Sequence, residues 1–556
     1  MHLVMFETHG NQRYIFSSPR LKENIGASHL LTQLGRWVHD ASEKEGIALT
    51  DVSISSGKVI VAVDSEAAAR GLISATTRMV LKSAPGVDTT GVFIPMSSRY
   101  VTRADLEKIH AESASHALTR PPSSARFCSL PFLEPGRDSL LPAVPPRKRS
   151  EEVYSLPSTI ARFQAREARE YLLALASGHP GLEDQAEHLL ANPDALERDP
   201  DSWSKIAVIH LDGNGVGMMV RGLSDRLASI PSAVFEKRIQ CDASNPDALR
   251  LALLALNKSL DSLMKGAFCD AWALVSDLAL QEGFGVVPVV PVILGGDDAT
   301  VITDGAFALP FVEAFLRAFE KRSAEDPLIR ALADNDMLTA GAGVAVVRRN
   351  FPFHIAYELA ERLASAAKSV GKSTTVPCSA LSYHILYDST VLDPEELIGS
   401  YAPFACEQGA AQALPAMTAR PYRVLPREQL TLPLSPPTAN ESWDAMRLRA
   451  AWFAGVCTAP GGKRINRFPK TRAARIRKIL SDAVLLSGDE QNEELARART
   501  EWEVARNQRD LTRLVDALGS ERLMLDLIDL SELLPRTYLE NADQLTAPVS
   551  AAEGLS

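Results

Sequence analysis

Two adjacent carboxylates on a glycine turn constrain this chain more than any other feature of its sequence. In the segment 286–303, Asp297 and Asp298 follow Gly295 and Gly296, and a β-branched apolar run lies on either side. Glycine permits the backbone angles of a tight turn and leaves space for a phosphate to approach, while the apolar runs predict buried strands. We therefore expect a β-hairpin that carries its chemistry at the tip.

A third carboxylate ends another apolar run earlier in the chain. Residues 206–211 predict a strand, Asp212 follows them, and Gly213 begins a series of three glycines at alternate positions. Mg²⁺ and Mn²⁺ prefer hard oxygen ligands, and a site for phosphates needs only a few carboxylates because the nucleotide completes the shell. We predict that Asp212, Asp297 and Asp298 hold two such ions for nucleotidyl transfer. The alternative is that these aspartates only cap turns.

A strand and a helix follow at 337–347 and 355–371. The helix has an apolar stripe at helical spacing, and Lys368 and Lys372 lie near its end, away from that stripe. A lysine at this place could fold over a triphosphate. The competing interpretation is a solvated lysine pair that the helix C-terminus favours.

This order of elements resembles the palm domain of two related families, the GGDEF-type nucleotide cyclases and the large subunit of type III CRISPR effector complexes. The second Asp of the GGDD motif favours the CRISPR branch. The resemblance implies that Asp212, Asp297 and Asp298 bind metal and ATP, with the backbone of Gly213, Gly295 and Gly296 beside the nucleotide. It also implies that Lys368 binds phosphate and that the product is a cyclic oligoadenylate second messenger.

The N-terminal part is similar to the first palm of the same CRISPR family. Residues 14–31 carry the resemblance, and Gly26 to Ser28 is its closest match, as a turn that opens a helix. The hairpin position holds Ser55-Ser56-Gly57-Lys58 in place of GGDD, so this palm looks degenerate. Ser28 could contact a second nucleotide there, or it could be an ordinary helix N-cap. Two ferredoxin-like palms predict an α+β fold.

Length and proline clusters indicate several domains in the 556 residues. We expect a short variant of the family without its HD nuclease domain and without DNase activity, because His39-Asp40 has no further histidines at metal-site spacing. The expected segments are 1–115 (degenerate first palm), 116–200 (linker and helical module), 201–395 (catalytic palm), 396–441 (proline-rich linker), 442–540 (all-helical C-terminal domain) and 541–556 (disordered tail).

A basic run in the C-terminal domain contains no acidic residue and could track the phosphates of a nucleic acid. The alternative is a solvated helical face, and the net charge of −10 argues against a surface devoted to nucleic acid. The candidate contacts are Lys463, Arg464, Arg467, Lys470, Arg472 and Arg475.

Six scattered cysteines contain no CxxC pair, so we expect neither a disulfide framework nor the zinc site common in the family. No bilayer-spanning run and no signal peptide are found, which predicts a cytoplasmic protein. The expected function is a two-metal cyclase that uses ATP in antiviral defence, with RNA and RNA-guided CRISPR backbone subunits as partners, and a homo-oligomer stays open. The alternatives are a scaffold subunit with a dormant cyclase and a cyclic dinucleotide synthase on the same palm.

Overall fold

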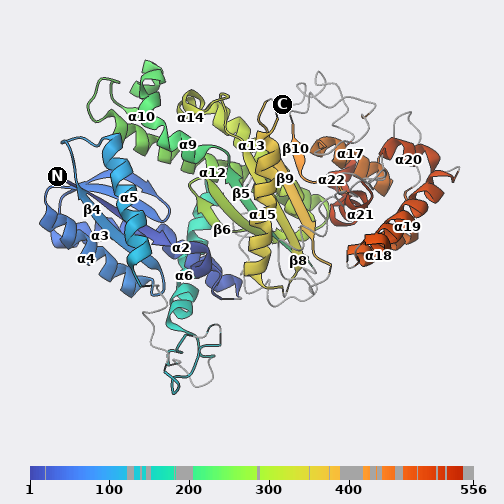
Figure 1. The fold of residues 1–556 in the computed structure, drawn as a ribbon, viewed down its shortest axis with the longest axis horizontal. Helices are drawn as coiled ribbons and strands as arrows, with labels where there is room; N and C mark the ends of the chain where they lie inside the picture. The colour runs from blue at the N-terminus through green and yellow to red at the C-terminus, as the bar shows by residue number, and fades with distance from the viewer. Residues whose placement is uncertain are drawn as a thin grey trace.

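The computed structural model contains two β-sheets and a helical C-terminal region, arranged along the long axis of the molecule (Figure 1). It describes residues 1–18, 20–121, 130–137, 139, 141–145, 152–180, 182, 205–284, 289–349, 351–374, 376–387, 418–425, 434, 441–457, 467–484, 486, 488–508, 511–519 and 523–542.

The first sheet is antiparallel and has the order β2-β3-β1-β4. This order, with one helical segment between β1 and β2 and another between β3 and β4, is the ferredoxin-like arrangement. Its elements are β1 (His2–His9), α1 (Asn11–Ile15), α2 (Leu21–Thr32), α3 (Leu34–Glu45), β2 (Leu49–Ser55), β3 (Lys58–Val63), α4 (Glu66–Ser83), β4 (Asp88–Pro95) and the following helix α5 (Arg103–Thr119).

The second sheet repeats this arrangement and adds two strands at one edge, in the order β10-β9-β8-β5-β7-β6. All pairs are antiparallel except β8 with β9. Its strands are β5 (Lys205–Gly213), β6 (Val289–Gly295), β7 (Asp298–Asp304), β8 (Ala340–Arg348), β9 (Ser379–Ile385) and β10 (Tyr422–Val424), and its longer helices are α12 (Ala248–Gln281), α13 (Ala308–Glu325) and α15 (Phe353–Lys372). Two palms in an α+β fold are therefore confirmed.

Short helical segments connect these elements of the second palm. They are α9 (Val216–Arg221), α10 (Leu223–Arg226), η3 (Leu227–Ser229), α11 (Ser232–Val234), η4 (Phe235–Ile239), η5 (Gly305–Phe307) and α14 (Pro327–Leu332).

Glycines on strand β8 set the distance between the second sheet and helix α15. A Cβ atom on Gly343 would lie 1.9 Å from the carbonyl oxygen of Ala360, which is closer than any non-bonded contact allows. The glycine therefore lets the helix backbone rest directly on the strand. Every residue of β8 except Arg348 is buried, as a strand covered on both faces requires.

The module expected at 116–200 contains helix α6 (Leu156–Ser177), which packs against α2 of the first palm. At the crossing, a Cβ atom on Gly26 would lie 1.8 Å from the carbonyl oxygen of Ala161. Gly26 and Ser28 thus lie in the middle of α2. The resemblance had suggested that they form a turn that opens a helix, and this prediction is wrong. The glycine serves the close approach of two helices.

The C-terminal region is helical, as expected. Its helices are α17 (Trp443–Ala454), α18 (Lys470–Val484), α19 (Gly488–Arg506), α20 (Thr512–Leu518), α21 (Met524–Leu533) and α22 (Arg536–Glu540). Strand β10 lies inside the segment 396–441 that we expected to be a linker, so the palm sheet extends into it. The expected disordered tail lies outside the described residues from 543 onward.

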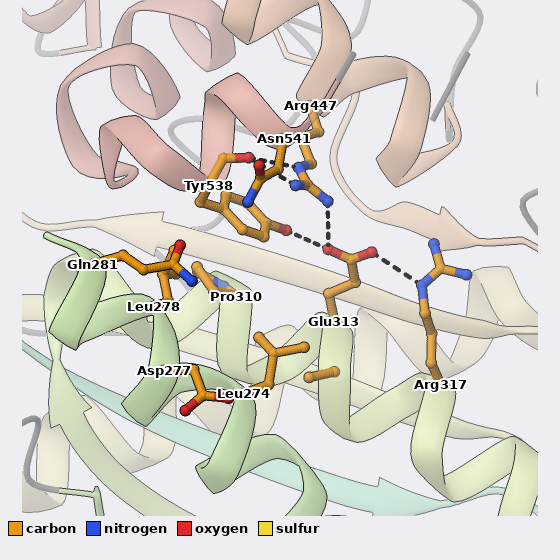
Figure 2. Close-up of a pocket in the computed structure, with 11 residues that line it drawn as sticks. Leu274, Asp277, Leu278, Gln281, Pro310, Glu313, Arg317, Arg447, Tyr538 and Asn541 are labelled. Carbon is orange, nitrogen blue, oxygen red and sulfur yellow. Dashed lines mark hydrogen bonds and ion pairs between the residues drawn. The ribbon is translucent and has the colours of Figure 1, made fainter. Parts of the chain in front are cut away.

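A buried charge cluster joins the C-terminal helices to the second palm (Figure 2). Glu313 of α13 accepts hydrogen bonds from Arg317 at 3.0 Å, from Arg447 at 3.4 Å and from the Tyr538 hydroxyl. These side chains form part of the wall of a cavity of about 260 Å³ between the two regions. Because its charges are paired within the wall, we interpret the cluster as a structural joint.

Candidate functional site

The three predicted carboxylates converge at one end of the second sheet. Asp212 near the end of β5 is the cross-strand partner of Asp298, the first residue of β7. Asp297 precedes it in the hairpin, and its carbonyl oxygen accepts a 2.8 Å hydrogen bond from the backbone N–H of Gly213. Gly296 has φ +70°, a left-handed angle that favours glycine, so the turn places both aspartates at its tip.

Lys368 reaches this tip from helix α15 and forms an ion pair with Asp212. Strand β8 makes room for it, because a Cβ atom on Gly341 would lie 2.3 Å from Cγ of Lys368. Lys372 is exposed and instead lines a neighbouring cavity of about 200 Å³ together with Asn214 and residues that precede β8. Of the two predicted lysines, the structure therefore brings only Lys368 to the carboxylates.

Burial and the charges of neighbouring carboxylates raise the pKa values of Asp297 and Asp298. Burial, followed by the charges of Asp212, Asp297 and Glu361, raises the pKa of Asp298 to about 7, although Lys368 acts in the opposite direction. Burial also raises the pKa of Asp297. A group of carboxylates whose pKa values rise in this way is what a bound cation would relieve.

Among the residues that the structure describes, one oxygen of Asp298 has no hydrogen-bond partner. Its Oδ1 atom is excluded from solvent although the side chain as a whole is 39% exposed, and the nearest cationic candidate, Nδ1 of His210, lies 3.9 Å away. Burial lowers the pKa of His210 to about 4, so the imidazole is neutral near pH 7 and supplies no charge. An orphaned carboxylate oxygen fits the demand of Mg²⁺ or Mn²⁺ for hard oxygen ligands.

The side chains are not yet in the geometry of a metal site. Within the described part of the chain, no group of three or more His, Cys, Asp or Glu side chains is arranged to hold an ion. In this arrangement the ammonium of Lys368 pairs with Asp212, one of the three carboxylates.

Sequence reasoning missed two aromatic side chains near Asp298, those of His210 and Tyr357. His210 is on the same face of β5 as Asp212, and its ring contacts that of Tyr357 at a centroid distance of 5.5 Å. The Tyr357 hydroxyl accepts a 2.7 Å hydrogen bond from Gln12 of the first palm. A histidine two positions before a candidate ligand was the available signal, whereas the contact with Gln12 depends on how the palms pack.

Ser28 is only 9% exposed and belongs to the interior of α2, so it is not a helix N-cap. Its contact with a second nucleotide stays a prediction.

The basic run is partly neutralised by acidic side chains of its own domain. Arg472 and Arg475 form ion pairs with Glu501 at 2.6 and 2.8 Å. Arg467 and Lys470 are exposed, while Lys463 and Arg464 lie outside the described residues. Binding of nucleic acid by this run therefore stays a prediction, with less free positive charge than the sequence indicated.

Neither cysteine bridges nor membrane spans are found in the described residues. Cys241, Cys269, Cys378 and Cys457 form no disulfide. Among the helices of the described residues, none has the length and apolar character required to cross a bilayer.

No family model and no curated protein matches the sequence. Solved structures do match the fold. A Csm1–Csm4 cassette in complex with pppApApA is 12% identical with a TM-score of 0.50, over 95% of this chain and 69% of the other. The cassette in complex with cA4 is 11% identical with a TM-score of 0.48, over 97% and 70%.

A third match is the Csm1–Csm4 subcomplex in the type III-A CRISPR–Csm interference complex. It is 12% identical with a TM-score of 0.46, over 95% of this chain and 70% of the other. The match with a TM-score of 0.50 shows that the chain has the fold found in a Csm1–Csm4 cassette.

Proposed function

We propose that the chain is a metal-dependent nucleotidyl transferase that joins ATP molecules into cyclic oligoadenylate-type products. The observation that carries the proposal is the convergence of Asp212, Asp297 and Asp298 beside Lys368 at one hairpin tip. The fold supports it, since a cassette of the same fold is in complex with pppApApA, a linear chain of three adenylates.

The three aspartates and the lysine have different roles in the proposed reaction. Asp212, Asp297 and Asp298 would hold two Mg²⁺ or Mn²⁺ ions, which when bound polarise the ribose hydroxyl and the pyrophosphate leaving group. Lys368 would leave Asp212 and bind the triphosphate. The 3′ oxygen of one ATP then forms a bond to the α-phosphorus of the next, the α–β phosphoanhydride bond breaks, pyrophosphate leaves and the hydroxyl proton passes to solvent.

The same fold supports a place in an RNA-guided assembly. The matching cassette contains a second subunit, Csm4. We therefore include in the proposal that this chain works in the cytoplasm with CRISPR backbone subunits and responds to RNA in antiviral defence.

The test is product analysis by mass spectrometry. Purified protein is incubated with ATP, GTP or both, with Mg²⁺ or Mn²⁺, in the presence and absence of candidate RNA. We expect cyclic or linear oligoadenylates from the wild type, and none from the double variant Asp297→Ala with Asp298→Ala. The control Asp242→Ala, at an exposed position outside the hairpin, should keep wild-type activity.

The results separate the alternatives. Products made from GTP alone would replace this proposal with a cyclic dinucleotide synthase. A wild type that is inert under every condition would leave only the scaffold function.

A further inference from the structure

The tip of the first palm has the same backbone pairing as the catalytic tip of the second. In the first palm, Glu7 of β1 pairs across the ladder with Lys58, the first residue of β3. In the second palm, Asp212 of β5 pairs in the same way with Asp298, the first residue of β7. The register therefore makes Glu7 the counterpart of Asp212 and Lys58 the counterpart of Asp298.

The neighbouring backbone contacts confirm this correspondence. The N–H of Thr8 donates to the carbonyl of Gly57 at 2.8 Å, and the N–H of Gly213 donates to the carbonyl of Asp297 at 2.8 Å. Each hairpin has a loop of two residues between its paired strand ends. The two tips are thus equivalent residue by residue, and they lie close together, because a Cβ atom on Gly295 would be 3.5 Å from Cβ of Ser56.

The third carboxylate has no room in the first palm. Gly57, the counterpart of Asp297, has φ +75°, and a Cβ atom there would lie 2.6 Å from Oγ1 of Thr8. In the second palm the left-handed residue is Gly296 instead, and the position opposite Asp297 is Gly213. The side chain that fills this space therefore comes from Thr8 in one palm and from Asp297 in the other.

An ammonium group occupies the remaining space in the first palm. Nζ of Lys58 lies 2.7 Å from Oε1 of Glu7, and the hydroxyl of Ser113 donates to Oε2 at 2.8 Å. Ser113 is on α5, the helix after the fourth strand, just as Lys368 is on α15 after the fourth strand of the second palm. The carboxylate of the first strand is capped from the following helix in both palms.

The two lysines lie on different kinds of element, Lys368 on a helix and Lys58 on a strand. Lys368 comes from helix α15 and is added to the carboxylates of its palm. Lys58 occupies the strand position that corresponds to Asp298, so in the first palm an ammonium replaces a carboxylate.

We infer that the first palm keeps a cation site of the same design as the catalytic one and fills it with the ammonium of Lys58. This inference rests on the metal site of the proposed function. Only the second palm then recruits divalent ions. The first palm has a latent divalent-cation site that becomes active when Lys58 is replaced by a carboxylate, with weaker binding than in the second palm because Gly57 supplies no third ligand.

The experiment measures Mn²⁺ bound per chain by electron paramagnetic resonance in the full-length protein. The background is the Asp297→Ala, Asp298→Ala variant, in which the second-palm site is removed. On this background we expect Lys58→Asp to add one Mn²⁺ ion per chain. The isosteric control Lys58→Asn should add none, and Glu7→Gln combined with Lys58→Asp should abolish the added ion.

Thermal unfolding supplies a second measurement. In the Lys58→Asp variant, the introduced carboxylate and Glu7 would repel each other without metal, so this variant should melt below the background protein in EDTA and recover with Mn²⁺. If it does not fold, Lys58→His replaces it, because a neutral imidazole beside Glu7 adds a ligand without that repulsion. The same added ion is expected.

The outcomes for this inference and for the proposed function are distinct. A wild type that binds no Mn²⁺, with a Lys58→Asp variant that does, would overturn the second-palm metal site and uphold the latent one. A folded Lys58→Asp or Lys58→His variant that gains no ion, or an added ion that survives Glu7→Gln, would overturn the inference.

Discussion

Replacing Glu313 by glutamine should loosen the joint between the C-terminal helices and the second palm. Glu313 is 4% exposed, and Arg447, its partner from α17, is 5% exposed. Glutamine keeps the size of the side chain and removes its charge. Arg317 would retain Asp444 at 2.7 Å, whereas Arg447 would keep the backbone carbonyl and the ring of Tyr538. One buried guanidinium would thus lose its carboxylate.

Two arguments give the magnitude. Removing one partner of a buried ion pair typically costs about 3–5 kcal/mol, because the remaining charge stays desolvated. Independently, burial alone would raise the pKa of Glu313, but Arg447 and Arg317 lower it from 4.5 to about 2. At 1.36 kcal/mol per pKa unit this is about 3 kcal/mol of stability at neutral pH. We therefore expect a loss of about 3 kcal/mol.

The sign of the pH dependence follows from the lowered pKa of Glu313. Because the folded-state pKa lies below the unfolded-state value, the stabilisation is complete above pH 4.5 and is lost as the pH falls toward 2. The wild type should lose this contribution over that range. The Glu313→Gln variant, which has no carboxyl group at this position, should not.

Native-state hydrogen exchange of the amides in α17 and α22 measures the effect locally, without assuming a single unfolding transition. A loss of about 3 kcal/mol corresponds to exchange that is about 100-fold faster. The control is Glu325→Gln on the same helix, which removes an exposed pair with Lys321 and should change little. Acceleration of fivefold or less in Glu313→Gln, or equal acceleration in both variants, would refute the reasoning.

Three further predictions concern the catalytic tip. Gly343→Ala should lower the melting temperature through a cost of at least about 1–3 kcal/mol, because the new Cβ atom meets the Ala360 carbonyl, whereas Gly217→Ala, with open space around it, should not. Lys368→Met should reduce ATP turnover about 100-fold in a steady-state assay, because the positive charge that binds the triphosphate is removed. Unchanged turnover would exclude a role of Lys368 in binding phosphate. Mn²⁺ affinity, measured by titration calorimetry, should increase as the pH rises through about 7, because Asp298 must lose its proton to bind an ion, and a flat profile would contradict its raised pKa.

Local sequence patterns predicted the elements of the catalytic tip. The glycine pair and the β-branched runs on either side correctly indicated the hairpin, and the apolar run before Asp212 indicated β5. These features depend on the backbone angles that glycine allows and on continuous apolar runs, both of which are properties of neighbouring residues. The helix with Lys368 was predicted for the same reason.

Contacts between distant segments were not predictable in this way. Lys368 was expected to bind phosphate, but its pairing with Asp212 depends on how closely α15 packs on β8, which Gly341 permits. Glu7 drew no attention because it lies in a strand without a glycine motif, and only the strand register reveals its equivalence to Asp212.

The sequence by itself determined that this chain has one hairpin with two carboxylates, a second hairpin without them and a helical C-terminal region, because local backbone preference and hydrophobic period are properties of short segments. The tertiary structure decided which charges meet. It paired one lysine, Lys368 of α15, with Asp212 and another, Lys58 of β3, with Glu7. Ion pairing between residues far apart in the chain depends on strand register and helix packing, and these exist only in the folded protein.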